Sequence, residues 1–485
     1  MVDVAIVGSG PNGLAAAVTM ARAGLSVKVF EAADSLGGGT RTQEVTLPGF
    51  RHDICAAVHP MALASPFFRA FELNRRIELI VPEISYGHPL DGGRAGIAYR
   101  DMDRMVAALG VDGRAWRAMF APLLQRLDGV IDFTQASLLR IPQDPLAVIR
   151  YGMRTLLQGT PAWNLGFTED VAPAMLTGVS AHAMGRLPTP ATAGAGLLLG
   201  TLAHAGGWAV PRGGSQAIAQ AMAEDFAAHG GQVELSHKVE SLAEVKEATG
   251  AKAVIFNTTP RALVEMAGDE LPERYRRKLA SFKYGAGVCK VDFALSGPVP
   301  WLAEELRKAP TLHLGGSRES IAFAENEVLA GRHPENPYVL AVQASVVDDS
   351  RAPQGQHTFW AYTHVPAGSA RDCTEDIIRA VEKYAPGFRD LILASRTETA
   401  QDVGRYNPNY IDGDISSGAV TLRQLLQRPV MAPDPWRTPV AGIYLGSAST
   451  SPGPAVHGMG GWFAARSALK NTFHLPVPEL GISTP

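Results

Sequence analysis

The sequence predicts an α/β fold in which a Rossmann-type dinucleotide-binding domain is interleaved with an α+β domain. Three segments, far apart in the chain, combine a buried strand, a glycine-rich turn and a helix, as a doubly wound parallel sheet requires. Two long stretches between them lack this alternation. A second domain is expected there, because 485 residues exceed what one hydrophobic core usually supports.

The first segment opens with the strand and glycine-rich turn of a βαβ unit. Residues 2–7 form a short apolar run typical of a buried parallel strand, and Gly8, Gly10 and Gly13 follow it. Gly8 permits the tight turn, and Gly10 lets the backbone approach a pyrophosphate. Gly13 removes a side chain where the helix must pack on the strand.

A helix over 13–23 and a second strand over 26–30 complete the unit, and Glu31 ends that strand. Glu31 is placed to accept hydrogen bonds from ribose hydroxyls. The charge of a pyrophosphate would lie over the helix N-terminus, where unpaired N–H groups and the helix dipole favour an anion. The segment therefore predicts nucleotide binding, with Pro11 and Asn12 of the same loop in the site.

Two later segments complete the predicted sheet. The second combines a glycine-containing turn at 211–214, a helix over 215–228 and strand patterns over 232–240 and 251–257, and the third combines a strand over 442–447 with a helix over 462–470. The stretch 70–207 is expected to be mostly helical, and 291–435 to mix strands and helices. We predict a discontinuous nucleotide domain of residues 1–70, 208–290 and 436–475, a substrate domain of residues 71–207 and 291–435, and a C-terminal tail of residues 476–485.

The residues after Glu31 favour FAD over NAD. Gly37, Gly38 and Gly39 let the chain pass close to a cofactor, and Arg41 can neutralise a pyrophosphate with two hydrogen bonds. The stretch 31–42, which ends at Thr42, resembles the GGxxR element of amine-oxidase and phytoene-desaturase-like flavoproteins.

The resemblance extends to other parts of the nucleotide domain and fades in the substrate domain. The glycine-rich stretch 446–461 is similar to the closing flavin motif of these flavoproteins, 208–260 to their middle segment, and 53–68 to the bacterial phytoene-dehydrogenase-related group. The chain departs from the pattern at Gly446 and Ser447, where relatives often carry an acidic residue.

The resemblance implies a glutathione-reductase-like FAD domain. By it, Glu31 would bind the adenosine ribose, Val239 would offer backbone contacts to adenine, and the flavin would be lined by Gly446, Ser447, Gly453 and Val456. The FAD is expected to be noncovalent, because no cysteine or histidine lies in a recognisable attachment motif. No second GxGxxG follows a plausible strand, so electrons are expected to leave to a diffusible acceptor such as oxygen or a quinone, or to return to the substrate.

Three residues are candidates for the chemistry. Lys290 resembles the lysine that amine oxidases place near flavin N5 through a water; the alternative is a solvent-facing strand lysine. His457 precedes the last predicted helix and could handle protons, or it could cap and pack in a crowded loop. His59 could face the flavin, although such a histidine is more often satisfied structurally.

The composition excludes several kinds of partner and site. The net charge of −3 gives no electrostatic case for nucleic acid, and the three cysteines, Cys55, Cys289 and Cys373, show no spacing typical of a disulfide framework or a metal site. A strand beginning near residue 2 leaves no room for a signal peptide, so the cytoplasm is expected. Reversible membrane contact through an apolar entrance remains compatible with the sequence.

The resulting functional prediction is an FAD-dependent oxidoreductase that transfers a hydride from a C–H bond to flavin N5. The family resemblance favours formation of a C=C bond in a mostly apolar small molecule. One alternative is a redox-neutral isomerase or a saturase that uses the same flavin chemistry. Another is an FAD-stabilised binding protein with little turnover.

Overall fold

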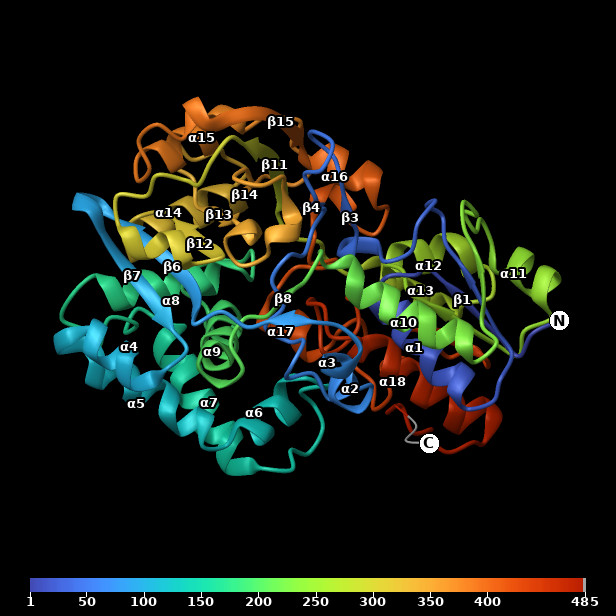
Figure 1. Cartoon of the computed structure of the whole chain (residues 1–485). Helices are drawn as coiled ribbons and strands as arrows, with labels where there is room; N and C mark the ends of the chain where they lie inside the picture. Colours follow the sequence, from blue (N-terminus) through green and yellow to red (C-terminus); the bar gives the residue numbers. More distant parts are fainter. Residues whose placement is uncertain (483–485) are drawn as a thin grey trace.

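The computed structural model describes residues 1–482, and its first layer is a five-stranded sheet in the order β16-β10-β1-β2-β9. All neighbouring strands in this sheet are parallel. The α/β fold class is therefore confirmed (Figure 1). The strands are β1 (Val4–Val7), β2 (Val27–Phe30), β9 (Gln232–Glu234), β10 (Ala253–Phe256) and β16 (Ile443–Leu445).

Helix α1 (Pro11–Arg22) follows β1 and packs against α18 (Met459–Ala468), near the other end of the chain. Proline suits the first position of α1, because the N–H group that it lacks would have no partner within the helix. A Cβ atom on Gly461 would lie 1.6 Å from the carbonyl oxygen of Asn12. Glycine at this position therefore lets α18 lie directly on α1 (Figure 1).

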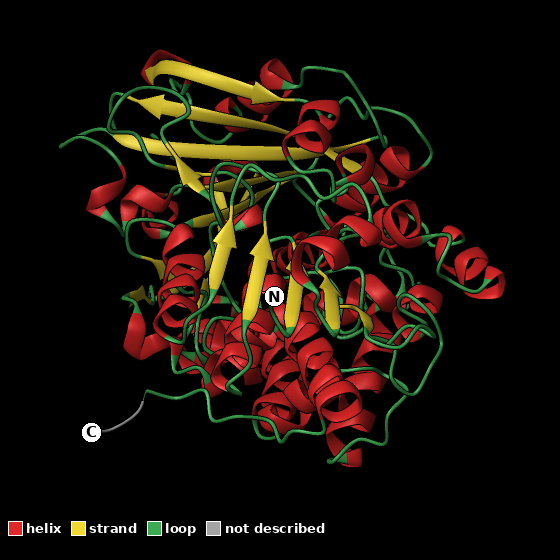
Figure 2. Cartoon of the chain, turned by 90° about the vertical axis from the view of Figure 1, so that its right-hand side faces the viewer, coloured by secondary structure: helices red, strands yellow, loops and turns green. Residues whose placement is uncertain are grey.

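The second sheet has seven strands in the order β15-β11-β14-β13-β12-β6-β7, and only its β12–β6 pair is parallel. Figure 2 shows its long strands above the parallel sheet and crosswise to it. Its strand β11 begins before residue 290 and carries Lys290. The strands are β6 (Ile84–Leu90), β7 (Arg94–Tyr99), β11 (Gly287–Leu295), β12 (Thr311–Leu314), β13 (Val339–Val342), β14 (His357–Val365) and β15 (Ile392–Glu398).

The stretch 70–207 is less uniformly helical than expected, because β6 and β7 form a hairpin at its start. Every residue of β6 is buried, so its sequence lacks the alternation by which a half-exposed strand is recognised. Gly92 and Gly93 turn the chain with φ angles of 76° and 72°. The helices of this stretch are α2 (Pro66–Ala70), which begins just before it, α3 (Leu73–Arg76), α4 (Met102–Ala108), α5 (Gly113–Leu124), α6 (Leu127–Thr134), α7 (Pro145–Gln158), α8 (Val171–Ala181) and α9 (Pro190–Ala205).

A second difference concerns 232–240, where only β9 is a strand. Ser236 has a left-handed φ of 54°, and the N–H of His237 donates to the carbonyl oxygen of Glu31 at 2.9 Å. The chain therefore turns away from the sheet after Glu234. The remaining elements are β3 (Thr42–Gln43), β4 (His52–Asp53), β5 (Leu79–Ile80), β8 (Val210–Pro211), α10 (Gln216–Ala228), α11 (Leu242–Thr249), α12 (Pro260–Ala267), α13 (Glu273–Ala280), α14 (Arg318–Leu329), α15 (Thr374–Glu382), α16 (Ala400–Tyr406) and α17 (Leu422–Leu426).

The uncharged stretch 187–211 contains α9 and the loops around it. Across residues 1–482, no helix combines the length and apolar character that crossing a membrane would require.

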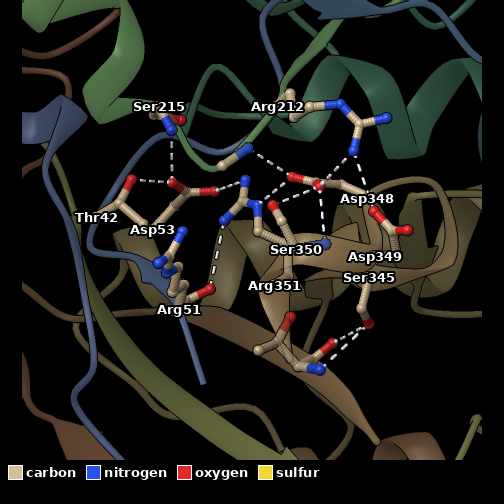
Figure 3. A network of polar contacts seen from close by, with 12 residues as sticks. Thr42, Arg51, Asp53, Arg212, Ser215, Ser345, Asp348, Asp349, Ser350 and Arg351 are labelled. Atoms are coloured by element: carbon tan, nitrogen blue, oxygen red, sulfur yellow. Dashed lines mark hydrogen bonds and ion pairs between the residues drawn. The ribbon is translucent and has the colours of Figure 1, made fainter. Parts of the chain in front are cut away.

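A buried ionic network joins the segment 348–351, after β13, to β4 and to the residue just before α10 (Figure 3). Arg351 is 1% exposed and donates to Asp53 on β4 and to Asp348, both at 2.8 Å. Asp53 also accepts hydrogen bonds from the Thr42 hydroxyl at 2.7 Å and the Ser215 N–H at 2.8 Å. The network as a whole thus links three segments that are distant in sequence, because Arg351 joins Asp53 to Asp348 and Asp53 in turn binds Ser215.

Candidate functional site

A cavity of about 1000 Å³ extends from the parallel sheet to the seven-stranded sheet. At one end, its lining includes the loops that follow β1 and β2. At the other end, it includes Leu340 and Val342 of β13 and Trp360 and Tyr362 of β14. Ligands of open α/β sheets bind beyond the carboxyl ends of the parallel strands, so this position fits a nucleotide at the first end.

The glycine loop after β1 has the close contacts that its sequence predicts. Gly8 has a φ of +95°, and a Cβ atom on Gly13 would lie 2.0 Å from the Gly8 carbonyl oxygen. Gly8, Gly10, Pro11 and Asn12 line the cavity, whereas Gly13 lies behind them. Gly13 therefore allows the loop and α1 to approach closely.

The Glu31 carboxylate lies in the cavity wall in an orientation fixed by the glycine loop. One oxygen accepts from the Ser9 N–H at 2.8 Å and the Ser9 hydroxyl at 2.5 Å, and the other accepts from the Ala33 N–H at 2.9 Å. The second oxygen also contacts Arg41 Nη2, but at a long distance of 3.4 Å. That oxygen is suited to accept a further donor, such as a ribose hydroxyl.

Arg41 is the clearest sign that an anion belongs in the cavity. Its side chain is buried, lines the cavity and stacks over the Tyr406 ring at 5.3 Å, while its Nε has no hydrogen-bond partner among the described residues. Its Nη2 reaches the Glu31 carboxylate only at 3.4 Å, so a pyrophosphate in the cavity would give this weakly paired, buried cation an anionic partner. The residues present therefore fit a dinucleotide.

The loop 446–458 forms another wall. Ser447, Val456 and His457 line the cavity, whereas Gly446 and Gly453 do not. A Cβ atom on Gly446 would lie 2.6 Å from the Ala464 Cβ, so this glycine allows α18 to pack closely. Gly453 has a φ of +121°, which favours glycine.

The cavity brings together most of the residues predicted to bind the cofactor. Thr42, like Gly13, Gly446 and Gly453, lies outside the lining; its hydroxyl bonds Asp53 in the ionic network. The predicted residues that line the cavity are Gly8, Gly10, Pro11, Asn12, Glu31, Gly38, Arg41, Val239, Ser447, Val456 and His457.

His457 is held by backbone groups at both ring nitrogens. Its Nδ1 accepts from the Met459 N–H at 3.0 Å, so its Nε2 carries the proton and donates to the Gly453 carbonyl oxygen at 3.2 Å. Burial lowers the pKa of His457 to about 4. In this geometry His457 fixes the loop before α18 and has neither nitrogen available for a substrate.

His59 also lines the cavity and has one nitrogen engaged. Its Nε2 donates to the Ser215 hydroxyl at 2.7 Å, because that hydroxyl itself donates to the Ala56 carbonyl oxygen at 2.6 Å. Burial lowers the pKa of His59 to about 4. His59 is therefore neutral near pH 7.

Lys290 is a buried residue, and the alternative of a solvent-facing lysine is wrong. Its side chain is 4% exposed, and its Nζ bonds both oxygens of Asp292 at 2.5 and 2.6 Å. Burial raises the pKa of Asp292, and the nearby Lys290 charge opposes that rise. Lys290 is thus part of a buried ion pair.

Lys290 does not line the large cavity, but it borders a smaller one of about 20 Å³. This small cavity shares Cys55, Tyr362 and Tyr410 with the lining of the large one. Lys290 lies opposite Tyr362 in the β11–β14 pair, so both side chains are on one face of the sheet. A space of this size holds one water, which could connect Lys290 with the large cavity.

The main lining residues that sequence reasoning missed are aromatic. Trp360 and Tyr362 alternate along β14, a period-two pattern that the sequence did contain. For the turn-rich loop 404–410, the sequence allowed entry into the cavity as the alternative to a solvated loop, and Tyr410 of this loop does line the cavity. Of the two tryptophans that the sequence offered as possible cavity walls, Trp208 lines the cavity and Trp462 does not.

No group of three or more histidine, cysteine or acidic residues in the part of the chain that the structure describes is arranged to hold a metal ion.

Comparison with protein families gives a match over most of the chain. The model of the flavin-containing amine oxidoreductases matches residues 12–466. Among curated proteins, the rat (Rattus norvegicus) pyridine nucleotide-disulfide oxidoreductase domain-containing protein 2 is 23% identical over 549 residues, covering 97% of this chain and 93% of the rat protein. The mouse (Mus musculus) protein of the same name is 24% identical, with the same coverage.

Solved structures show the same fold at lower identity. Putrescine oxidase bound to putrescine has a TM-score of 0.56 and 18% identity, covering 98% of this chain and 99% of that one. Cyclohexylamine oxidase from Brevibacterium oxydans has a TM-score of 0.57 and 14% identity, covering 97% and 98%. Reduced UDP-galactopyranose mutase has a TM-score of 0.54 and 14% identity, covering 97% and 96%.

Proposed function

Because the chain belongs to the family of flavin-containing amine oxidoreductases, we propose that it is an FAD-dependent oxidoreductase acting on a mostly apolar small molecule. A bound FAD, held by the glycine loop, Glu31 and Arg41, would supply an acceptor for a hydride from a substrate C–H bond. The FAD is held without a covalent bond. Burial raises the pKa of the Cys55 thiol in the cavity wall, so this cysteine is protonated and a poor nucleophile.

The observation that carries the proposal is the distribution of charge along the cavity. Its lining carboxylates are Glu31, Glu240 and Glu265, all in the segments 1–70 and 208–290 that the sequence predicts to form the nucleotide domain. Among the described residues of 71–207 and 291–435, no aspartate or glutamate lines it. An ammonium group would find no carboxylate partner at that end, whereas an apolar chain would meet aromatic and aliphatic side chains.

Anaerobic mixing with candidate substrates tests the proposal. Flavin absorbance should fall on mixing with an apolar substrate that contains a C–C bond able to be desaturated. Mass spectrometry should then show a product that is lighter by two hydrogen atoms. Reduction by primary amines alone would contradict the apolar substrate. The electron acceptor is proposed to be oxygen or a quinone, and reoxidation rates with each would identify it.

Isomerisation is the second candidate, because a mutase shares the fold. In that case the flavin would end oxidised, and the product would have the mass of the substrate. A flavin that no substrate or artificial acceptor can cycle would indicate a binding protein with little turnover.

We propose that Lys290 acts through one water in the small cavity, moving a proton or placing a positive charge near the reacting atoms. The ion pair with Asp292 supports this role, because it holds the ammonium group in place behind Tyr362 and Cys55. Replacing Lys290 with methionine should slow one half-reaction by about 10²–10⁴-fold, the usual loss for a general acid or base. Stopped-flow measurement of flavin reduction and reoxidation would identify which one.

The burial of Lys290 requires a matched control. Lys290→Met leaves Asp292 buried without its partner, which typically costs about 3–5 kcal/mol of stability. The double variant Lys290→Met/Asp292→Asn removes both charges and should recover most of that loss. If the double variant is folded and both half-reactions stay within about twofold of wild type, far below the loss expected for a catalytic group, Lys290 has no catalytic role.

An apolar surface beside the cavity supports the proposal of reversible membrane contact by a cytoplasmic protein. Leu146, Ile149 and Met153 lie on α7 and are 40–66% exposed, while Tyr151 and Thr155 of the same helix line the cavity. Co-sedimentation with lipid vesicles should decrease in Ile149→Glu/Met153→Glu. Unchanged sedimentation would contradict membrane contact at α7.

A further inference from the structure

A pair of buried histidines lies at the substrate end of the cavity. His182, directly after α8, lines the cavity, and its Nε2 lies 2.7 Å from the Nε2 of His313 on β12. The two rings are perpendicular, with centroids 4.8 Å apart, and the Trp208 ring packs against both. Neither histidine has a role in the function proposed above.

The two ring nitrogens outside this bond have different surroundings. Nδ1 of His313 is buried and has no hydrogen-bond partner among residues 1–482. Nδ1 of His182 also has no partner in the described chain, but it is not fully buried. Because His182 lies deep in the protein and lines the cavity, that nitrogen is accessible from the cavity.

The buried environment determines which of the two histidines donates the hydrogen bond between their Nε2 atoms. Burial lowers the pKa of His182 to about 3, and burial likewise lowers that of His313, so both rings are neutral. If His182 donated at Nε2, the proton of His313 would lie on its buried and unpaired Nδ1. Orphaned buried N–H groups are rare because they are costly, so His313 donates and His182 carries its own proton on Nδ1.

We propose that His182 donates a hydrogen bond from Nδ1 to an uncharged oxygen, such as a carbonyl or ether oxygen, of the apolar substrate. This inference rests on the proposed function and makes the substrate class narrower. A hydrocarbon would leave the His182 N–H unpaired in an otherwise apolar region, whereas a substrate with one acceptor oxygen would satisfy it. His182 is thus a specificity-determining residue.

Two probes of nearly the same shape test this inference on the FAD-loaded protein. Benzophenone carries a carbonyl group where 1,1-diphenylethylene carries a methylene group, and both dissociation constants follow from the change in flavin absorbance. The wild type should bind benzophenone about 2- to 12-fold more tightly, the usual contribution of one hydrogen bond. The infrared carbonyl stretch of bound benzophenone should lie at lower frequency than in a variant that lacks the donor.

Variants separate hydrogen bonding from packing. His182→Phe should abolish both the preference and the infrared shift while still binding 1,1-diphenylethylene. His182→Asn places an amide nitrogen near the position of Nδ1 and should restore part of the preference. Met184→Leu, a change in a neighbouring lining residue, should leave the preference unchanged.

The outcomes distinguish the two proposals. Equal binding of both probes by the wild type, or a preference for benzophenone that survives in His182→Phe, would overturn the role of His182. Either result would leave the proposal of an apolar substrate standing. Failure of the wild type to bind either probe would overturn the proposal that the substrate end of the cavity binds a mostly apolar molecule.

Discussion

Glu31 illustrates how one residue serves the protein and its ligand together. Its carboxylate holds Ser9 of the glycine loop and the Ala33 backbone through three hydrogen bonds and also faces the cavity. The same side chain therefore shapes the loop that would surround a pyrophosphate and presents an acceptor to the adjacent ribose. Its loss should affect FAD binding through both effects.

Glu31→Ala should weaken FAD binding by about 1.5–3 kcal/mol, the range for hydrogen bonds to a charged group. Titration of the apoprotein with FAD, followed by the quenching of FAD fluorescence, measures this change. Asp34→Ala removes an exposed acidic residue from the loop after β2, three residues beyond Glu31, and serves as the control. Equal affinity of Glu31→Ala and Asp34→Ala would show that Glu31 does not contact the ribose.

At the level of elements, the sequence predicts best those strands and loops whose residues are required by local chemistry. The first strand, the glycine loop and Glu31 are recognisable because backbone close to a phosphate needs glycine at fixed spacings. The β6–β7 hairpin was missed because a completely buried strand shows no alternation. The position of Lys290 behind Tyr362 depends on the pairing of β11 with β14, which no local pattern specifies.

The contact between α1 and α18 gives a prediction about an element. Gly461→Ala should lower the free energy of unfolding by about 1–3 kcal/mol or more, because the added methyl group overlaps the Asn12 carbonyl oxygen. Gly152→Ala on α7 is the control: an added Cβ there meets nothing within 4 Å, so a gain of about 0.5–1 kcal/mol is expected. Urea denaturation measures both, and equal stability of the two variants would show that the helices have room to separate.

At the level of the whole molecule, buried neutral histidines couple stability to pH. Burial lowers the pKa values of His52 and His182 to about 3 and those of His59, His88 and His457 to about 4. In an unfolded chain, the same groups take up protons near pH 6.5. Between about pH 6.5 and 4, the unfolded state therefore binds more protons, and the free energy of unfolding falls as the pH falls.

The melting temperature should accordingly be highest above about pH 6.5 and decrease steadily toward pH 4. Carboxylates alone would begin to destabilise the fold only below about pH 5, so the onset of the loss distinguishes the two causes. Calorimetry at constant ionic strength between pH 7.5 and 4.5 measures it. A melting temperature that stays constant across this range would contradict the buried neutral state of these histidines.

The docking of α18 on α1 and of β16 on β10 also sets an order of events during synthesis. The glycine loop leaves the ribosome before the strand and helix that complete its surroundings, which emerge only after the whole seven-stranded sheet. Until then, β10 presents an open edge that can pair with other chains. A chain ending at residue 440 should therefore retain no flavin and should aggregate. The cofactor would accordingly bind only after β16 and α18 have been synthesised.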